Sequence, residues 1–147
     1  MSHTYSQNYL HIVFSTKERR NSIPREMHTQ LWAYLAGICK NYEIHTQAIG
    51  GTGNHVHVLL CLPPKVALAK AVQLLKSNSS KWLGQHVAHF EWQDGYGAFS
   101  VSASNMGAVL RYIQNQPAHH RKLSFEEEFR AMLRKHNVEY DAKFMFG

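Results

Sequence analysis

The sequence predicts an α+β fold of the ferredoxin-like class, an antiparallel sheet of four to five strands with helices packed on one face. Strand-like and helix-like segments follow one another in the order β-α-β-β-α-β, and two further helical segments come after them. No internal repeat, low-complexity segment or flexible linker interrupts the 147 residues, a length that suits one hydrophobic core. Residues 1–147 are therefore expected to form a single domain.

The first strand and the first helix are marked by their side-chain patterns. Residues 8–16 are rich in β-branched and aromatic side chains, and Leu10, Ile12 and Phe14 would share the core face of a strand. After a basic cluster, a Ser-x-Pro start signal and apolar residues at helical spacing predict a helix over residues 24–41. Each element therefore offers one apolar side to a common core.

A hairpin of two strands is expected next. Residues 43–49 and 54–60 are strand-like, and the glycine-rich segment 50–53 between them favours a turn. Pro63 and Pro64 end the second of these strands, because proline cannot donate a hydrogen bond to a sheet ladder.

The second half of the chain is expected to supply three helices and one strand. A helix over residues 66–82 has an apolar side and a basic, serine-rich side, and residues 98–102 form a short strand. A third helix lies between Ser104 as its cap and Pro117 as its stop signal. The capping box at residues 124–127 begins a fourth helix with an apolar stripe.

Composition restricts the partner and the cellular setting. The net charge of +6 and the pI of about 9.4 favour a polyanionic partner, above all nucleic acid. No apolar run approaches the length of about 20 residues that a membrane span needs, so no membrane partner is expected. The N-terminus has no charged segment followed by an apolar one, and no signal peptide is expected. Cys39 and Cys61 are too few for a disulfide framework and indicate thiols in a reducing cytoplasm.

A pair of histidines in the third strand is the first candidate for chemistry. Residues two apart on a strand point to the same face, so His55 and His57 would lie side by side while Val56, Val58 and Leu60 point into the core. Two neutral imidazoles on a rigid strand make half of a site for a divalent metal. The alternative is an exposed strand face that carries two of the eleven histidines.

The third helix supplies a second candidate pair. Tyr112 and Gln116 are four residues apart and would be neighbours on a helix face, beside the buried stripe that contains Ile113. Taken alone, they could be a boundary tyrosine and a surface glutamine. Beside two histidines, the Gln116 amide oxygen can complete a metal site that keeps open positions, and a tyrosine can act as a covalent nucleophile.

The His-Val-His motif at residues 55–57 and the Tyr-x-x-x-Gln motif at residues 112–116 resemble the single-tyrosine HUH transposases of small bacterial insertion sequences. This IS200-like family includes the REP-associated tyrosine transposases. The basic end of the first strand and the segments 95–102 and 115–120 also look like the family. The resemblance runs from the first strand to the fourth helix, so that the C-terminal helices would carry the nucleophile.

The resemblance implies a DNA transposase, a metal-dependent endonuclease and strand transferase for single-stranded DNA. Tyr112 would attack a backbone phosphate and form a 5′-phosphotyrosine, and another strand end would then rejoin the DNA. His55, His57 and Gln116 match the family's ligands for a divalent metal, Mg²⁺ or Mn²⁺. The metal would polarise the scissile phosphate.

The resemblance also implies hairpin DNA ends as the substrate and a homodimer as the functional unit. In several members the tyrosine of one subunit serves the histidines of the other, so Tyr112 and His57 of one chain could lie far apart. Eight basic residues are candidates for phosphate contacts. They are Lys17, Arg19, Arg20, Lys76, Lys81, Arg111, Arg121 and Lys122.

Other classes of protein share parts of this pattern. Histidine-triad hydrolases need a third histidine where Leu59 stands, and two-histidine phosphoesterases need a second His-x-Thr motif, for which His45 lacks the spacing. Relaxases and replication initiators are usually longer. A non-catalytic, RRM-like module that binds single-stranded nucleic acid would leave Tyr112 and Gln116 without a role. A domesticated relative acting on chromosomal repeats stays open as an alternative.

Overall fold

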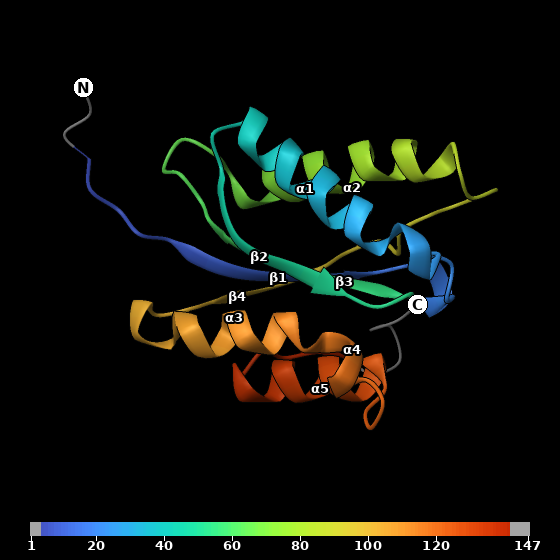
Figure 1. The fold of residues 1–147 in the computed structure, drawn as a ribbon. Coiled ribbons are helices and arrows are strands. Elements are labelled where there is room, and N and C mark those ends of the chain that lie inside the picture. The colour runs from blue at the N-terminus through green and yellow to red at the C-terminus, as the bar shows by residue number, and fades with distance from the viewer. Residues whose placement is uncertain (1–3, 142–147) are drawn as a thin grey trace.

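The computed structural model describes residues 4–141 and contains a four-stranded antiparallel sheet between two layers of helices (Figure 1). The strands lie in the order β2-β3-β1-β4. Their bounds are β1 Tyr9–Ser15, β2 His45–Gly51, β3 His55–Cys61 and β4 Gly97–Ser100. This order, with a helix after β1 and another after β3, is the ferredoxin-like arrangement, and the predicted fold class is confirmed.

Helices cover both faces of the sheet (Figure 1). On one face lie α1 (His28–Asn41) and α2 (Leu68–Gly84), and on the other lie α3 (Met106–Gln114), α4 (Gln116–His119) and α5 (Phe125–Lys135). The sequence predicted helices packed on one face of the sheet. The second face is covered because it also carries Val13 and Phe99, which are buried against Phe125 and Leu133 of α5.

The larger hydrophobic core lies between the sheet and the layer of α1 and α2. Every second residue of β1 and β3 points into it, as the strand pattern predicted. Its fully buried side chains include Ile12, Leu31, Leu35, Val56, Val58, Leu60 and Leu83. The opposite residues of the same two strands face α3, α4 and α5.

A glycine lets α3 approach the sheet closely. A Cβ at Gly50 of β2 would lie 2.5 Å from the carbonyl oxygen of Ile113, closer than side-chain carbon atoms come to a backbone oxygen. In the sheet, Gly50 pairs with His57. The absence of a side chain at Gly50 therefore brings α3, with Tyr112, down beside the histidine strand.

The helix predicted over residues 105–116 is interrupted. It begins after a 3₁₀ turn at Ala103–Asn105, with no hydrogen bond from a capping side chain, and α3 ends at Gln114. Pro117 does not stop a helix but lies in the first turn of α4, where its missing N–H costs nothing. The capping box of α5 is confirmed, since the Ser124 hydroxyl accepts from the Glu127 N–H at 3.1 Å.

None of the helices within residues 4–141 is long and apolar enough to cross a membrane. Residues 1–3 and 142–147 of the expected single domain lie outside the described part of the chain.

Candidate active site

The two histidines of β3 lie side by side. Both side chains are fully buried, and their ring centroids are 5.0 Å apart. Val56, Val58 and Leu60 alternate with them and belong to the core under α1 and α2. The predicted alternation is confirmed, and the alternative of an exposed histidine face is wrong, because α3, α4 and α5 enclose both rings.

Neighbouring groups fix the orientation of these two rings. The Nδ1 of His55 lies 2.8 Å from the Asn54 Oδ1 and 3.0 Å from the Thr52 Oγ1. The Nδ1 of His57 lies 2.7 Å from the Nε2 of His11 on β1. A metal-binding histidine usually has its second nitrogen held in this way.

Tyr112 and Gln116 lie against the histidines, although the helix breaks between them. The Gln116 side chain is fully buried, and its Oε1 lies 2.8 Å from the His55 Nε2. The Tyr112 ring centroid is 5.8 Å from that of His57. All four residues predicted for the site come from one chain. Within this chain Tyr112 lies close to His57, because α3 packs on the strands of its own sheet, and the separation that a site shared between subunits could give is not seen here.

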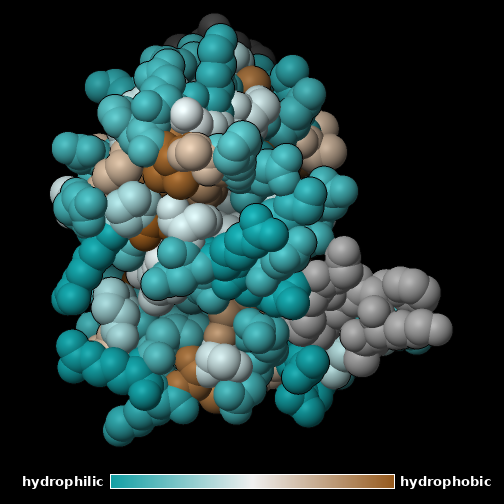
Figure 2. Space-filling view, turned by 90° about the vertical axis from the view of Figure 1, so that its right-hand side faces the viewer, coloured by the Kyte–Doolittle hydropathy of each residue, from teal (hydrophilic) through white to brown (hydrophobic). Residues whose placement is uncertain are grey.

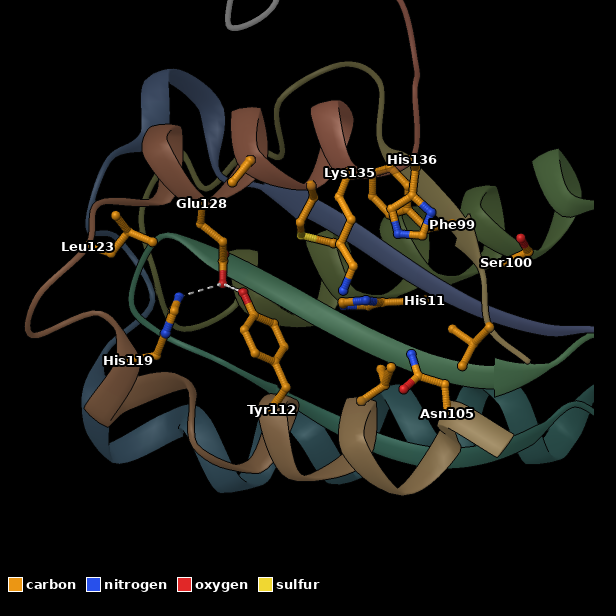
Figure 3. A pocket seen from close by; sticks show the side chains of 14 residues that line it. His11, Phe99, Ser100, Asn105, Tyr112, His119, Leu123, Glu128, Lys135 and His136 are labelled. Atoms are coloured by element: carbon orange, nitrogen blue, oxygen red, sulfur yellow. Dashed lines mark hydrogen bonds and ion pairs between the residues drawn. The ribbon is translucent and has the colours of Figure 1, made fainter. Parts of the chain in front are cut away.

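Glu128 of α5 stands at the centre of the cluster, and the sequence analysis missed it. Its side chain is 2% exposed. One oxygen, Oε1, lies 3.1 Å from the His57 Nε2 and 3.5 Å from the His55 Nε2. The other, Oε2, accepts hydrogen bonds from the Tyr112 hydroxyl and from the Gln116 Nε2, the latter at 2.8 Å. Figure 3 shows Glu128 descending from its helix toward Tyr112.

A third histidine completes the cluster. His120, just after α4, donates from Nδ1 to the Leu123 carbonyl oxygen at 2.6 Å, so the Nε2 of the neutral ring keeps a lone pair. That Nε2 lies 3.1 Å from the Glu128 Oε1. Ligand atoms of His55, His57, His120 and Glu128 all lie within 4.8 Å of one another.

The sequence held a signal for the missed carboxylate. Glu128 lies three residues after Phe125 and four before Met132, both of which belong to the apolar stripe predicted for α5. A charged residue on the buried side of a helix needs a partner in the interior. His11 carried a similar signal, since it alternates with the core residues of β1 and so shares the face of the His55–His57 pair.

Burial and mutual contacts set the protonation of the site. Burial, followed by the proximity of His57, lowers the pKa of His55 to about 3, so this imidazole is neutral near pH 7. Burial alone would raise the pKa of the Glu128 carboxyl, but contacts with His120, His57 and Tyr112 outweigh it and hold that pKa well below its usual range. Burial and the hydrogen bond to Glu128 raise the pKa of Tyr112.

A divalent cation fits this set of donors. The His120 Nε2 is buried and makes no hydrogen bond, since its contact with Glu128 lacks hydrogen-bond geometry. Neutral imidazoles, an amide oxygen and a carboxylate are ligands that divalent metals accept. The structure thus has the ligand types for a metal ion beside the Tyr112 hydroxyl.

A cavity of about 290 Å³ gives access to the Tyr112 hydroxyl. Tyr112, His119 and Glu128 line one end of it, and Phe99 and His136 lie at the other (Figure 3). The Phe99 and His136 rings have centroids 4.6 Å apart. The nucleophile predicted from the sequence is therefore half-buried but reachable from solvent.

The predicted phosphate-binding residues fall into separate groups. Arg19 and Arg121 line one hollow of about 770 Å³ that also reaches His120. Lys17 and Lys76 line another of about 540 Å³, where Lys17 pairs with Glu91 at 2.9 Å and the Lys76 Nζ donates to backbone oxygens. The remaining four, Arg20, Lys81, Arg111 and Lys122, are exposed and line neither hollow.

The right-hand side of the molecule in Figure 1 is mainly hydrophilic. Figure 2 shows hydrophobic residues there only as small patches between polar side chains.

Comparisons with known proteins give the family and the fold. Residues 4–116 match the family model described as transposase IS200 like. The chain is 26% identical over 124 residues to the transposase for insertion sequence element IS200 of Salmonella typhimurium, covering 79% of this chain and 81% of that protein. The corresponding transposase of Salmonella typhi matches to the same extent.

Two solved structures share the fold. A candidate transposase from Deinococcus radiodurans superposes with a TM-score of 0.64 at 22% identity, over 79% of this chain and 95% of that one. A REP-associated tyrosine transposase bound to a REP hairpin superposes with a TM-score of 0.61 at 15% identity, over 82% of this chain and 73% of that one. The family match ends at Gln116, so His120 and Glu128 lie beyond it.

Proposed function

Because the chain belongs to the family of IS200-like transposases, we propose that it cleaves and rejoins single-stranded DNA through a 5′-phosphotyrosine on Tyr112. The observation that carries the proposal is the position of Tyr112. Its hydroxyl lies in the same buried cluster as His57 and Gln116 and also borders an open cavity. A nucleophile needs both an activating environment and access to its substrate.

The cleavage step exchanges one phosphodiester for another. The Tyr112 oxygen bonds to the scissile phosphorus as the bond from phosphorus to the 3′ oxygen breaks, and the phenol proton is lost while the 3′ oxygen gains one. The strand then carries a 5′-phosphotyrosine and a free 3′-hydroxyl. Attack by another 3′-hydroxyl on this linkage reverses the exchange and rejoins the DNA, and no external energy source is needed.

His55, His57 and Gln116 are proposed to hold a divalent ion, Mg²⁺ or Mn²⁺, which when bound supplies Lewis-acid polarisation of the scissile phosphate. These side chains are fully buried, so their positions are set by packing before any substrate arrives. Preorganised groups lose little energy to rearrangement during the reaction.

The proposed substrate is single-stranded DNA with hairpins. The REP-associated transposase that shares the fold is bound to such a hairpin. Arg19 and Arg121 are the strongest candidates for phosphate contacts, because the hollow they line reaches His120 at the edge of the site. We further propose a homodimer as the functional unit, as the family resemblance implies, and cleavage within one chain is the simplest use of the observed geometry.

The test is formation of a covalent protein–DNA adduct. A single-stranded oligonucleotide with a hairpin is incubated with the protein and Mn²⁺, and the products are separated on a denaturing gel. The adduct should form with the unmodified protein and with Tyr42→Phe, whose exposed ring lies at the end of α1, away from the site. It should vanish for Tyr112→Phe. An adduct that persists in Tyr112→Phe would rule out this tyrosine as the nucleophile.

A further inference from the structure

Glu128 uses its two carboxylate oxygens for different partners. Oε1 faces nitrogen atoms of three histidines, at 3.1 Å from His57, 3.1 Å from His120 and 3.5 Å from His55. Oε2 faces hydrogen-bond donors, the Tyr112 hydroxyl and the Gln116 amide. One side chain thus lies between the histidine cluster and the nucleophile.

Apart from the His57 Nε2, which can donate to Oε1, the groups around this oxygen offer more acceptors than protons. Neutral His55 has a single ring N–H, but its Nδ1 and its Nε2 each lie 2.8 Å from an amide oxygen, that of Asn54 and that of Gln116. The His120 Nδ1 donates to the Leu123 carbonyl oxygen, so the Nε2 of the neutral ring turns a lone pair inward. The Gln116 Nε2 donates to Glu128, and the Gln116 Oε1 faces the His55 Nε2 at 2.8 Å. Buried acceptors that face one another repel, and a cation between them removes that cost.

We propose that Glu128 is a metal ligand through Oε1 and a positioning residue for the Tyr112 hydroxyl through Oε2, with His120 as a further ligand. The assignment of Glu128 and His120 as metal ligands depends only on the positions of the ligand atoms in the cluster. The positioning half rests on the proposed function, because it takes Tyr112 as the nucleophile. Neither residue lies in the segment that matches the family model.

The chemistry of the cation supports a carboxylate ligand. The ligands that the resemblance implies, His55, His57 and Gln116, are all neutral, and two of them are nitrogen donors. Mg²⁺ and Mn²⁺ prefer oxygen ligands, carboxylates above all. Glu128 adds both the preferred atom and a negative charge in a buried setting, where the attraction between charge and cation is weakly screened.

The same carboxylate would couple the metal to the nucleophile. A carboxylate held by an ion at Oε1 cannot turn about its axis, so Oε2 keeps its place against the Tyr112 hydroxyl. The tyrosine oxygen is then fixed relative to the ion that polarises the phosphate. Placement of this accuracy contributes strongly to reactions between two bound groups.

The first experiment measures Mn²⁺ affinity by isothermal titration calorimetry, without DNA. Glutamine has one acceptor oxygen in place of two, so Glu128→Gln cannot serve the metal and Tyr112 together, and we expect its affinity to fall at least about tenfold. His120→Ala should also lower the Mn²⁺ affinity, because it removes one proposed ligand. Glu127→Gln is the matched control, because it removes the same charge one residue away on α5 and glutamine still supports a capping box.

Thermal unfolding separates a ligand defect from a folding defect. Glu128→Gln must show a cooperative transition, and Glu128→Asp, which keeps the charge, should recover part of the Mn²⁺ affinity that Glu128→Gln loses. Unchanged affinity in Glu128→Gln would overturn the metal-ligand assignment. So would an equal loss in Glu127→Gln, because the charge of the helix and not the ligand atom would then be responsible.

The second experiment follows adduct formation against Mn²⁺ concentration. A purely structural role for Glu128 would change the amount of active protein but not the Mn²⁺ concentration that gives half the maximal rate. We expect Glu128→Gln to shift that concentration upward, because a neutral amide oxygen is a weaker ligand than a carboxylate. We also expect a lower maximal rate, because at saturating Mn²⁺ the one glutamine oxygen would serve the ion and Tyr112 would face the amide NH₂, which cannot accept. A normal maximal rate at saturating Mn²⁺ would overturn the positioning role.

The two proposals fail in different ways. Tyr112→Phe should bind Mn²⁺ like the unmodified protein, since Tyr112 is not a ligand. If no adduct forms with any hairpin but Glu128→Gln still loses Mn²⁺ affinity, the proposed function is wrong and the metal site stands. If the adduct forms normally in Glu128→Gln at every Mn²⁺ concentration, the further inference is wrong and the proposed function stands.

Discussion

The two faces of the sheet are built from the same strands but have opposite chemistry. Toward α1 and α2, β1 and β3 present side chains such as Phe14, Val58 and Leu60, all in one apolar core. Toward α3, α4 and α5, the alternate residues of these strands include His11, His55 and His57, which are buried beside Glu128. A period of two along a strand is enough to divide the molecule in this way.

The two faces should also contribute differently to the stability and to the chemistry of the protein. Buried apolar surface stabilises the fold by about 25 cal/mol per Å². Buried polar and charged groups contribute little net stability, since the desolvation they suffer offsets their mutual attraction. The face under α1 and α2 should therefore set the free energy of unfolding, and the face under α3, α4 and α5 should set the chemistry. Substitutions on each face test whether stability and metal binding depend on separate sets of residues.

The largest effect on stability is expected for Phe14→Ala. The Phe14 ring is 2% exposed and packs at right angles on Trp92, with centroids 4.8 Å apart. Truncation of a buried phenylalanine costs about 3–5 kcal/mol. Urea unfolding would measure this loss. Tyr5→Ala, at a position 92% exposed, is the control and should change almost nothing. The folded fraction of Phe14→Ala should still bind Mn²⁺, and a loss of metal affinity at full folding would contradict the division between the faces.

The second prediction concerns the face with the histidines. A substitution there should lower the Mn²⁺ affinity and change the free energy of unfolding little. His57→Ala removes a buried imidazole from the cluster, and we expect Mn²⁺ affinity in calorimetry to fall about tenfold to hundredfold or more. His45→Ala, at the exposed start of β2, removes a histidine outside the cluster and should leave the affinity unchanged. Unchanged affinity in His57→Ala would remove this residue from the ligands.

The two faces also differed in how far the sequence could predict them. The alternation of Val56, Val58 and Leu60 with His55 and His57 was visible as a local pattern, and the structure has it as predicted. Local patterns of this kind depend only on backbone geometry. The same is true of the Ser124 capping box, whose hydrogen bonds span three residues.

What the sequence did not predict depends on contacts between distant segments. Glu128 contacts His57 although the two are 71 residues apart in the sequence, and His11 contacts His57 although these two are 46 residues apart. The packing of α5 on the second face of the sheet brought Glu128 there, and no spacing along the chain encodes that packing. The break at Asn115 was missed for another reason. Pro117 was interpreted as a stop signal, although the first turn of a new helix accepts proline equally well.

The smallest predicted effect is a dependence of the free energy of unfolding on pH in the metal-free protein. It should arise from the face with the histidines and not from the apolar face. The pKa of His55 is lowered to about 3 in the folded state, while an ordinary histidine titrates near 6.5. Between these values the unfolded chain binds a proton that the folded protein does not. The contribution of the neutral His55 to stability is therefore present above pH 6.5 and is lost as the pH falls below it.

From pH 7.5 to pH 5.5 this linkage amounts to about 1.4 kcal/mol for one histidine. His55→Asn has no such proton to bind. In urea unfolding with a chelator, the difference in stability between the unmodified protein and His55→Asn should shift by that amount, in favour of His55→Asn, as the pH falls. The stability lost in Phe14→Ala should be the same at both pH values, because no titrating group is removed from the apolar face. A difference for His55→Asn that stays constant between the two pH values would mean that His55 titrates in the folded protein as it does in the unfolded chain. The division between an inert face and a titratable one would then fail at its centre.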